Sequence, residues 1–310
     1  MKDNCPWVSI SCITFNHAPY IRQCLDGFMM QQTNFPFEVL IHDDASTDGT
    51  TEIIKEYEAK YPDIIKPLYE EENQWVKGRR GSAVFNFPRA KGKYIALCEG
   101  DDYWTDPLKL QKQVDFLEAN SDYVMCTHHF NIFHQNDKTI EEDRRKTFKD
   151  DFTFDLDYFI SRKLWITQPL TLLYRRDALD REKYSQYPNA KDVTLIYHIL
   201  SHGKGVFLKE CMATYRVHDG GIWSGANRPQ QIKADIDTII GIYNIEKNTQ
   251  AATLIRNSIH SLGYLGLTFL KQYYKKYLKA IKIIYHELGG YCAIKSIIHS
   301  FNYFHSHFGY

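Results

Sequence analysis

Two short clusters of acidic residues carry the clearest chemical information in the sequence. One is Glu99-Gly100-Asp101-Asp102, which follows the strand-like run 93–98, and the other is Asp43-Asp44, which follows the run 37–42. Mg²⁺ and Mn²⁺ suit oxygen ligands, and Mg²⁺ usually takes one or two protein carboxylates together with phosphate oxygens. The first cluster therefore indicates a cation bound against a phosphate, and the alternative is a solvated acidic turn that precedes a helix at Pro107.

The second cluster is suited to contact a nucleotide. A carboxylate at the end of a strand accepts hydrogen bonds from a base N–H group or from ribose hydroxyls. Because the following residues are of helix-capping types, we interpret Asp48 as a cap of the helix at 50–60 and not as a ligand.

These clusters are positioned by strands that alternate with helices. Strands are predicted at 8–14, 37–42, 64–69, 93–98 and 123–129, and helices begin between them near Pro19, Thr50, Ser82 and Pro107. Such alternation implies parallel strands joined by right-handed crossovers. Ligands of open sheets of this kind bind beyond the carboxyl ends of the strands, so both acidic clusters are expected at one site.

The remainder of the chain is less regular. Residues 130–165 lack clear periodicity and are predicted to be a variable connection, followed by strands at 166–174 and 206–209. After about residue 227 the pattern is wholly helical. We therefore predict a catalytic α/β domain over residues 1–227 and a helical C-terminal region over 228–310.

Three motifs taken together resemble an inverting family 2 glycosyltransferase with the GT-A fold, of the type that makes bacterial surface polysaccharides. They are Val8–Asn16, His42–Thr50 and Lys91–Trp104, in the family's order and at its spacing. The resemblance is weaker from 126 to 225, and none is claimed beyond. It implies a Rossmann-like α/β fold, with a mostly parallel central sheet flanked by helices and an all-helical C-terminal appendage.

The resemblance also implies a donor site. Thr14, Phe15 and Asn16 end the first strand and would line the nucleotide pocket for a nucleoside-diphosphate sugar, with UDP the most frequent nucleotide in the family. Asp44 matches the family carboxylate that contacts the base, and Asp43 lies beside it.

The family's acidic motif binds Mn²⁺ or Mg²⁺, and Asp101 and Asp102 match it here, with Asp102 as the direct ligand. The family's usual form is Asp-x-Asp, and Glu99 stands at the first acid of one register, so either Glu99 or Asp101 assists Asp102. His218, in the Gly-rich segment 215–221, is expected to be a further metal ligand. The alternatives for His218 are a hydrogen bond to phosphate or a place in an ordinary loop.

The family's catalytic base is an acid just before a short helix, and Asp192 matches that position. The family often has Glu-Asp there, whereas Lys191 precedes Asp192 in this sequence. Asp177 and Asp180 are rivals, which we interpret as residues that cap or solvate a turn. The implied reaction is one in-line displacement, in which Asp192 takes the acceptor proton and the metal offsets charge on the departing nucleoside diphosphate.

Three other side chains could contact the ligands. Arg216 could balance phosphate charge. Trp104 and Trp223 could stack on a sugar, and Trp104 could equally lie in the core.

Composition bounds the partners and the compartment. The 38 basic and 38 acidic residues give a net charge of +0, so no general attraction to nucleic acid is indicated. The 7 cysteines are scattered without a CxxC pair, which favours a reducing compartment over a disulfide framework. The polar N-terminus and the lack of an apolar run of membrane-spanning length predict a cytoplasmic protein.

The C-terminal region is basic and amphipathic. Apolar residues recur there at helical spacing, interleaved with lysines, at Leu262, Leu265, Phe269, Tyr273 and Tyr277. Such a helix can lie on an anionic membrane, at the inner face of the cell membrane, which suits a glycan or lipid-linked acceptor. We favour the alternative that it packs against the catalytic domain or the second subunit of a homodimer.

Two other functions fit part of the pattern. A nucleotidyltransferase would carry a Gly-rich basic loop after its first strand, where this sequence has Thr14-Phe15-Asn16-His17, so we reject it. A GT-A-fold protein that binds nucleotide or glycan without turnover stays an alternative, and the acids at both strand ends argue against it.

Overall fold

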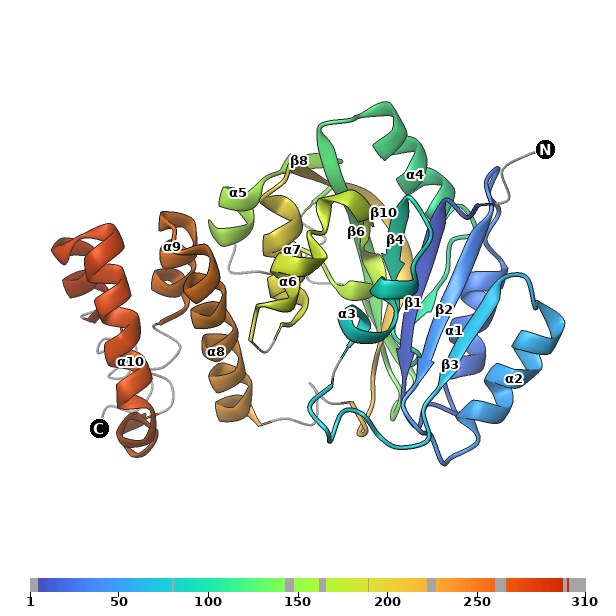
Figure 1. The fold of residues 1–310 in the computed structure, drawn as a ribbon, viewed down its shortest axis with the longest axis horizontal. Helices are drawn as coiled ribbons and strands as arrows, with labels where there is room; N and C mark the ends of the chain where they lie inside the picture. Colours follow the sequence, from blue (N-terminus) through green and yellow to red (C-terminus); the bar gives the residue numbers. More distant parts are fainter. Residues whose placement is uncertain are drawn as a thin grey trace. The chain divides into compact units, whose positions relative to one another are not determined.

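The computed structural model describes residues 5–79, 81–142, 148–161, 166–188, 190–221, 227–259, 266–297 and 300. The chain divides into two compact units (Figure 1). The first comprises Met1–Phe154, Thr167–Arg181 and Ile199–His218, and the second comprises Asp155–Ile166, Glu182–His198 and Asp219–Tyr310. Two segments N-terminal to the predicted boundary at 227 thus group with the second unit, and that boundary stays a prediction.

The first unit is built on one sheet. Its strands are β1 (Val8–Thr14), β2 (Phe37–Asp43), β3 (Ile65–Tyr69), β4 (Tyr94–Leu97), β5 (Tyr103–Trp104), β6 (Tyr123–His134), β7 (Thr139–Glu142), β8 (Phe152–Phe154), β9 (Leu173–Arg175) and β10 (Lys204–Val217). Their order is β3-β2-β1-β4-β9-β6-β10-β5, with β7 beside β6 and β8 beside β10. The long ladders β1 with β2 and β4, β2 with β3, and β6 with β10 are parallel, whereas the short strands pair antiparallel. The predicted α/β class with a mostly parallel central sheet is confirmed.

Helices cover both faces of this sheet (Figure 1). On one face lie α1 (Ile21–Met29), α2 (Thr50–Lys60) and α4 (Lys109–Ala119), whose apolar residues share a single core with the strands. On the other lie α3 (Ser82–Phe85) and the short 3-10 helix η1 (Phe87–Arg89). Further 3-10 turns are η2 (Pro169–Thr171) and η3 (Arg176–Ala178).

Alternation along β1 explains how its two faces differ. Val8, Ile10 and Cys12 are fully buried in the core beneath α1, as the two-residue period of a strand requires. Ser9 and Ser11 face the other side, where they donate hydrogen bonds to the side chains of Glu38 and Ser82 at 2.6 and 2.9 Å. The sheet therefore rests on an apolar layer on one face and a hydrogen-bonded polar layer on the other.

Two of the predicted strands differ from the structure. The strand expected at 166–174 is wrong over most of its length, because η2 occupies 169–171 and only β9 is extended. The strand expected at 206–209 is much longer, since β10 runs from Lys204 to Val217 with register shifts against β6.

The second unit is helical. Its helices are α5 (Leu156–Ser161), most of α6 (Arg181–Ser185) and α7 (Asp192–Leu200), α8 (Arg228–Glu246), α9 (Thr249–Ser258) and α10 (Gly266–Leu288). Asn227 begins α8 by accepting a hydrogen bond from the Gln230 backbone, and Asn248 caps α9 in the same way through Ala251. From residue 228 onward the described residues contain helices and no strand, as predicted. None of the described helices is long and apolar enough to span a membrane.

Candidate active site

The loops after β1 and β2 are joined by Asn16. This residue has a left-handed backbone, with φ of 54°, which Asn tolerates better than most residues. Its side-chain oxygen accepts from the Thr47 backbone and its own backbone N–H donates to Ser46 Oγ, both at 2.9 Å. Phe15 beside it is 43% exposed, so its ring is available for contact at the sheet edge. The structure thus brings 14–16 and 43–48 together, as the topology predicts.

Asp43 and Asp44 serve different local contacts. The Asp43 carboxylate accepts from Ser46 Oγ and from Thr51 Oγ1, both at 2.5 Å, and so fixes the turn into α2. The buried Asp44 carboxylate accepts from the backbone N–H groups of Gln74 and Trp75, at 2.5 and 3.1 Å. Each carboxylate oxygen has a second lone pair, so Asp44 retains capacity to accept from a ligand.

The loop after β4 lies against the end of β1. Gly100 donates from its backbone to Ile13 O at 3.0 Å, and a Cβ there would lie 2.7 Å from Thr14 Oγ1. Only glycine fits this approach without displacing its neighbour. Thr14 Oγ1 itself is buried and has no hydrogen-bond partner among the described residues. This contact places Asp101 and Asp102 at the same edge as Thr14.

Asp102 is buried with one oxygen engaged. Its Oδ1 accepts from the Arg216 backbone N–H at 2.8 Å, across the β5–β10 pairing. Burial, reinforced by the neighbouring Asp101 charge, raises the pKa of the Asp102 carboxyl well above its ordinary value. A bound cation would stabilise the ionised form and reverse that shift.

Asp101 faces two imidazoles. Its Oδ2 lies 3.1 Å from His218 Nε2 and 3.8 Å from His17 Nε2. Burial by itself would raise the pKa of Asp101, but the hydrogen bond with His218 and the attraction of His17 bring it below its ordinary value. Burial lowers the pKa of His17, which Asp101 only partly opposes, so His17 is a neutral ring at neutral pH. Asp101 Oδ1 is buried without a hydrogen-bond partner in the described part of the chain.

Arg216 holds this loop in place from β10. Its backbone contacts Asp102, and its Nε donates to the Asp101 carbonyl oxygen at 2.8 Å. The two terminal nitrogens donate to the side chains of Gln135 and Gln23, each at 2.6 Å. The Arg216 residue is 5% exposed, and its guanidinium donates to protein groups. These contacts favour a positioning role over direct contact with phosphate.

The donor set fits a divalent cation. Glu99, Asp101 and Asp102 offer oxygens that all lie within 4.8 Å of one another, and so do the ligand atoms of His17, Asp101 and His218. Asp101 belongs to both groups, and its unpartnered Oδ1 is a further free acceptor. Carboxylates with imidazole suit Mn²⁺, and the carboxylates alone suit Mg²⁺. Sequence reasoning missed His17; its position three residues past Thr14, on the same strand end, was the available indication.

Residues 9–182 match the family model described as glycosyl transferase family 2. The chain belongs to this family. A protein of Mycobacterium tuberculosis is 38% identical over 223 residues, which cover 71% of this chain and 61% of that relative. The chain therefore spans less than two thirds of the length of that relative. TuaG of Bacillus subtilis, described as a putative teichuronic acid biosynthesis glycosyltransferase, is 27% identical over 76% of this chain and 90% of its own length.

Solved structures share the fold of this family 2 chain. Residues 1–349 of TarS from S. aureus, in complex with UDP-GlcNAc, match with a TM-score of 0.66 and 18% identity, covering 96% of this chain and 90% of that one. The mannosyltransferase PcManGT from Pyrobaculum calidifontis, in complex with GDP-Man and Mn²⁺, gives a TM-score of 0.55 at 17% identity, covering 94% and 79%. The expected GT-A fold is thereby confirmed.

Asp192 is the first residue of α7 and belongs to the helical unit. Asp192 is an exposed residue. Among its rivals, Asp177 lies in η3. Trp104 is 2% exposed and donates from Nε1 to the Leu170 carbonyl oxygen, so it is a core residue. Trp223 lies outside the described residues.

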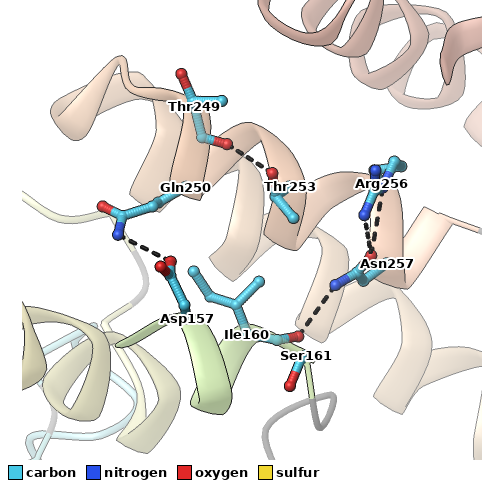
Figure 2. A pocket seen from close by; sticks show the side chains of 8 residues that line it. All are labelled: Asp157, Ile160, Ser161, Thr249, Gln250, Thr253, Arg256 and Asn257. Carbon is cyan, nitrogen blue, oxygen red and sulfur yellow. Dashed lines mark hydrogen bonds between the residues drawn. The ribbon is translucent and has the colours of Figure 1, made fainter. Parts of the chain in front are cut away.

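The helical unit of this family 2 chain contains a separate hollow between α5 and α9, with a volume of about 320 Å³ (Figure 2). It is lined by Asp157, Ile160, Ser161, Thr249, Gln250, Thr253, Arg256 and Asn257. Gln250 Nε2 donates to Asp157 Oδ1 at 3.0 Å, and Asn257 Nδ2 donates to the Ile160 carbonyl oxygen at 3.1 Å. These polar groups bind α5 to α9, and none of the predicted site residues lies there.

Proposed function

We propose that this protein is a metal-dependent inverting glycosyltransferase. It moves a hexosyl or N-acetylhexosaminyl group from a nucleoside-diphosphate sugar, UDP-linked, to a glycan or lipid-linked saccharide in surface polysaccharide synthesis. The observation that carries the proposal is the convergence, in a family 2 chain, of Asp44 and the Asp101-Asp102 pair at one edge of the sheet.

The donor half of the proposal rests on the loops after β1 and β2. Thr14, Phe15, Asn16 and Asp44 would form the nucleotide pocket, with Asp44 accepting from the base, while Asp43 holds the turn. The complexes of TarS with UDP-GlcNAc and of PcManGT with GDP-Man support a nucleotide-sugar donor, and the higher similarity of TarS favours UDP.

The metal half rests on the loop after β4. Asp102 and His218 would bind Mn²⁺ or Mg²⁺ with Asp101 beside them, and the Mn²⁺ in the PcManGT complex supports this assignment. When bound, the cation supplies the positive charge that stabilises the departing diphosphate. Arg216 keeps the Asp101-Asp102 loop rigid, so little reorganisation is needed when charge develops.

Asp192 is proposed as the base that accepts the proton of the acceptor hydroxyl. Its exposure leaves the carboxylate accessible to an acceptor hydroxyl, as a general base must be. A single displacement without a covalent sugar–enzyme intermediate inverts the anomeric centre. Replacement of Asp192 by Asn therefore separates the enzyme from the alternative of a GT-A-fold binding protein without turnover, which would lose nothing measurable.

The sequence pattern favoured packing of the C-terminal helix on protein, but the exposed apolar residues of α10 lead us to propose a cytoplasmic location with peripheral contact to an anionic membrane. On α10, Tyr274, Leu278 and Tyr285 are 49%, 51% and 65% exposed, and the charged Lys275 and Lys279 lie beside them. Exposed apolar residues beside lysines are typical of helices that lie in the headgroup region of a membrane. Loss of flotation with anionic vesicles in a Leu278→Glu variant would support this contact, and absence of flotation in the wild type would refute it.

The decisive experiment is a thermal shift assay with UDP, GDP and CMP, each with and without Mn²⁺. A nucleotide at a hundred times its dissociation constant adds about 2.7 kcal/mol of stability, which is readily measured. We expect stabilisation by UDP only with Mn²⁺, and its loss in Asp102→Asn. If no nucleotide stabilises the wild type, the transferase proposal is refuted.

A further inference from the structure

His17 reaches the cation site although no role is assigned to it above. It lies three residues past the end of β1, and hydrogen bonds hold both its backbone N–H group and its carbonyl oxygen. The backbone N–H donates to Thr50 Oγ1 at 2.8 Å, and the carbonyl oxygen accepts from the N–H groups of Tyr20 and Ile21 at the start of α1. The ring is therefore presented by two helix N-termini and does not lie in a free loop.

The positions of the three ligand atoms are compatible with one cation. His17 Nε2 and His218 Nε2 lie 3.8 and 3.1 Å from the same Asp101 oxygen, and all three atoms are within 4.8 Å of one another. With metal–ligand bonds of about 2.1 Å, octahedral ligands lie roughly 3 Å apart when adjacent and about 4.2 Å when opposite. The two imidazole rings are nearly perpendicular, at 89°, with centroids 6.2 Å apart, so they do not stack on each other.

No described residue occupies the outer nitrogen of the His17 ring through a hydrogen bond. The distance of 3.8 Å between His17 Nε2 and Asp101 Oδ2 is too long for one. Nε2 is not among the buried atoms that lack a partner, and the side chain is 17% exposed, so Nε2 is open to a ligand on the side of Asp101. Coordination of a cation would use this nitrogen.

We propose that His17 is a further protein ligand of the cation that Asp102 and His218 would bind beside Asp101, and that these two imidazoles make the site select Mn²⁺ over Mg²⁺. The inference rests on the proposed metal-dependent function and specifies its cation. Imidazole nitrogen suits first-row transition metals, whereas Mg²⁺ keeps oxygen ligands and water. A site made of carboxylates alone would discriminate less between Mn²⁺ and Mg²⁺.

The test is isothermal titration calorimetry of the 310-residue chain with Mn²⁺ alone and with Mg²⁺ alone. His17→Gln is compared with the wild type and with His286→Gln, a control at a side chain that is 84% exposed. Loss of an outer-shell partner alone costs about 10–100-fold in metal affinity, so removal of a ligand should weaken Mn²⁺ binding at least tenfold. We expect Mg²⁺ binding to change much less, so that the Mn²⁺ preference falls in His17→Gln and not in the control.

Pulsed electron paramagnetic resonance of bound Mn²⁺ provides a count of coordinated nitrogens that a purely structural role would not alter. We expect two imidazole nitrogens in the wild type and one in each of His17→Gln and His218→Gln. An unchanged count and affinity in His17→Gln overturns the inference and leaves the metal-dependent function intact. If the wild type binds no Mn²⁺ with or without UDP, both fail. Thermal unfolding of His17→Gln and His17→Asn verifies that the variants are folded.

Discussion

Replacement of Arg216 by alanine tests whether this side chain positions the acidic loop. The side chain donates three hydrogen bonds, to the Asp101 carbonyl oxygen, to Gln135 and to Gln23. The whole residue is 5% exposed. Hydrogen bonds to a charged group contribute about 1.5–3 kcal/mol each, or roughly 4–9 kcal/mol for three if they were additive. Removal of the guanidinium also removes its own desolvation cost of several kcal/mol, so the net loss is expected at about 3–5 kcal/mol.

Two assays report on this variant. Urea denaturation gives the free energy of unfolding, and Mn²⁺ titration reports whether the loop still presents Asp101. Arg22→Ala is the matched control, because Arg22 is a surface residue paired with Glu56 and should leave both quantities unchanged. Arg216→Lys keeps the charge without the planar set of donors, so it should recover only part of the stability and of the metal affinity.

A loss of less than about 1 kcal/mol in Arg216→Ala, within the value of one ordinary hydrogen bond, would refute this reasoning. The reasoning would also be refuted if the variant lost the expected stability but bound Mn²⁺ like the wild type. The loss of stability and the loss of metal affinity should occur together, because both follow from release of the acidic loop. Direct contact of Arg216 with phosphate predicts the opposite pattern, in which stability is kept and nucleotide affinity is lost.

Three further predictions concern other parts of the first unit and the proposed base. Gly100→Ala places a Cβ 2.7 Å from Thr14 Oγ1, so it should cost about 1–3 kcal/mol in urea denaturation, and no loss would contradict the close approach. Burial lowers the pKa of Lys109 to about 7, whereas the unfolded chain binds that proton up to about pH 10. The unfolded state therefore binds more protons between these values, and the free energy of unfolding should rise with pH from about 7 to 10. Lys109→Met should remove this rise and increase stability at neutral pH, and an unchanged pH profile would contradict it. Asp192→Asn should abolish sugar transfer in a radiolabel assay while the UDP and Mn²⁺ thermal shift stays as in the wild type, and retained transfer would exclude Asp192 as the base.

Local sequence patterns were sufficient to predict the strands and helices in the first half of the sheet. The predicted strand at 8–14 and helix at 50–60 coincide with β1 and α2, because each has its apolar residues at the spacing that its own geometry buries. The pairing of acids at one sheet edge followed from the parallel topology alone. These features depend on residues close together in the chain and on a general rule of strand order.

The strands of the second half could not be derived in the same way. β9 is antiparallel between β4 and β6, and β10 continues past Lys209 and Glu210 because it pairs with β6 over most of its length. Charged residues in the middle of a strand resemble a strand end in the sequence. The long ladder that keeps them extended is a tertiary property.

Only some residues of the proposed cation site could be predicted from the sequence. Asp101 and His218 were expected to lie here, whereas His17, in the loop between β1 and α1, was not. The pairing of β10 with β5 brings His218 to the same place. Asp43 was expected beside the base, and its contacts with Ser46 and Thr51 were not foreseen, because side-chain hydrogen bonds in a turn depend on rotamers that a sequence does not display. The roles of these residues in binding and catalysis stay predictions.

The contact of Arg216 with the Asp101-Asp102 loop has a consequence for synthesis on the ribosome. The acidic loop leaves the ribosome well before β10, because 116 residues separate Asp102 from His218 (218 − 102). At about 5–20 residues per second, this interval is roughly 6–23 s. During it the nascent chain has the acidic pair without the strand that orders it. The proposed ability to bind a cation would therefore be acquired late, when β10 joins the sheet, and a nascent chain that pauses before residue 218 would lack it.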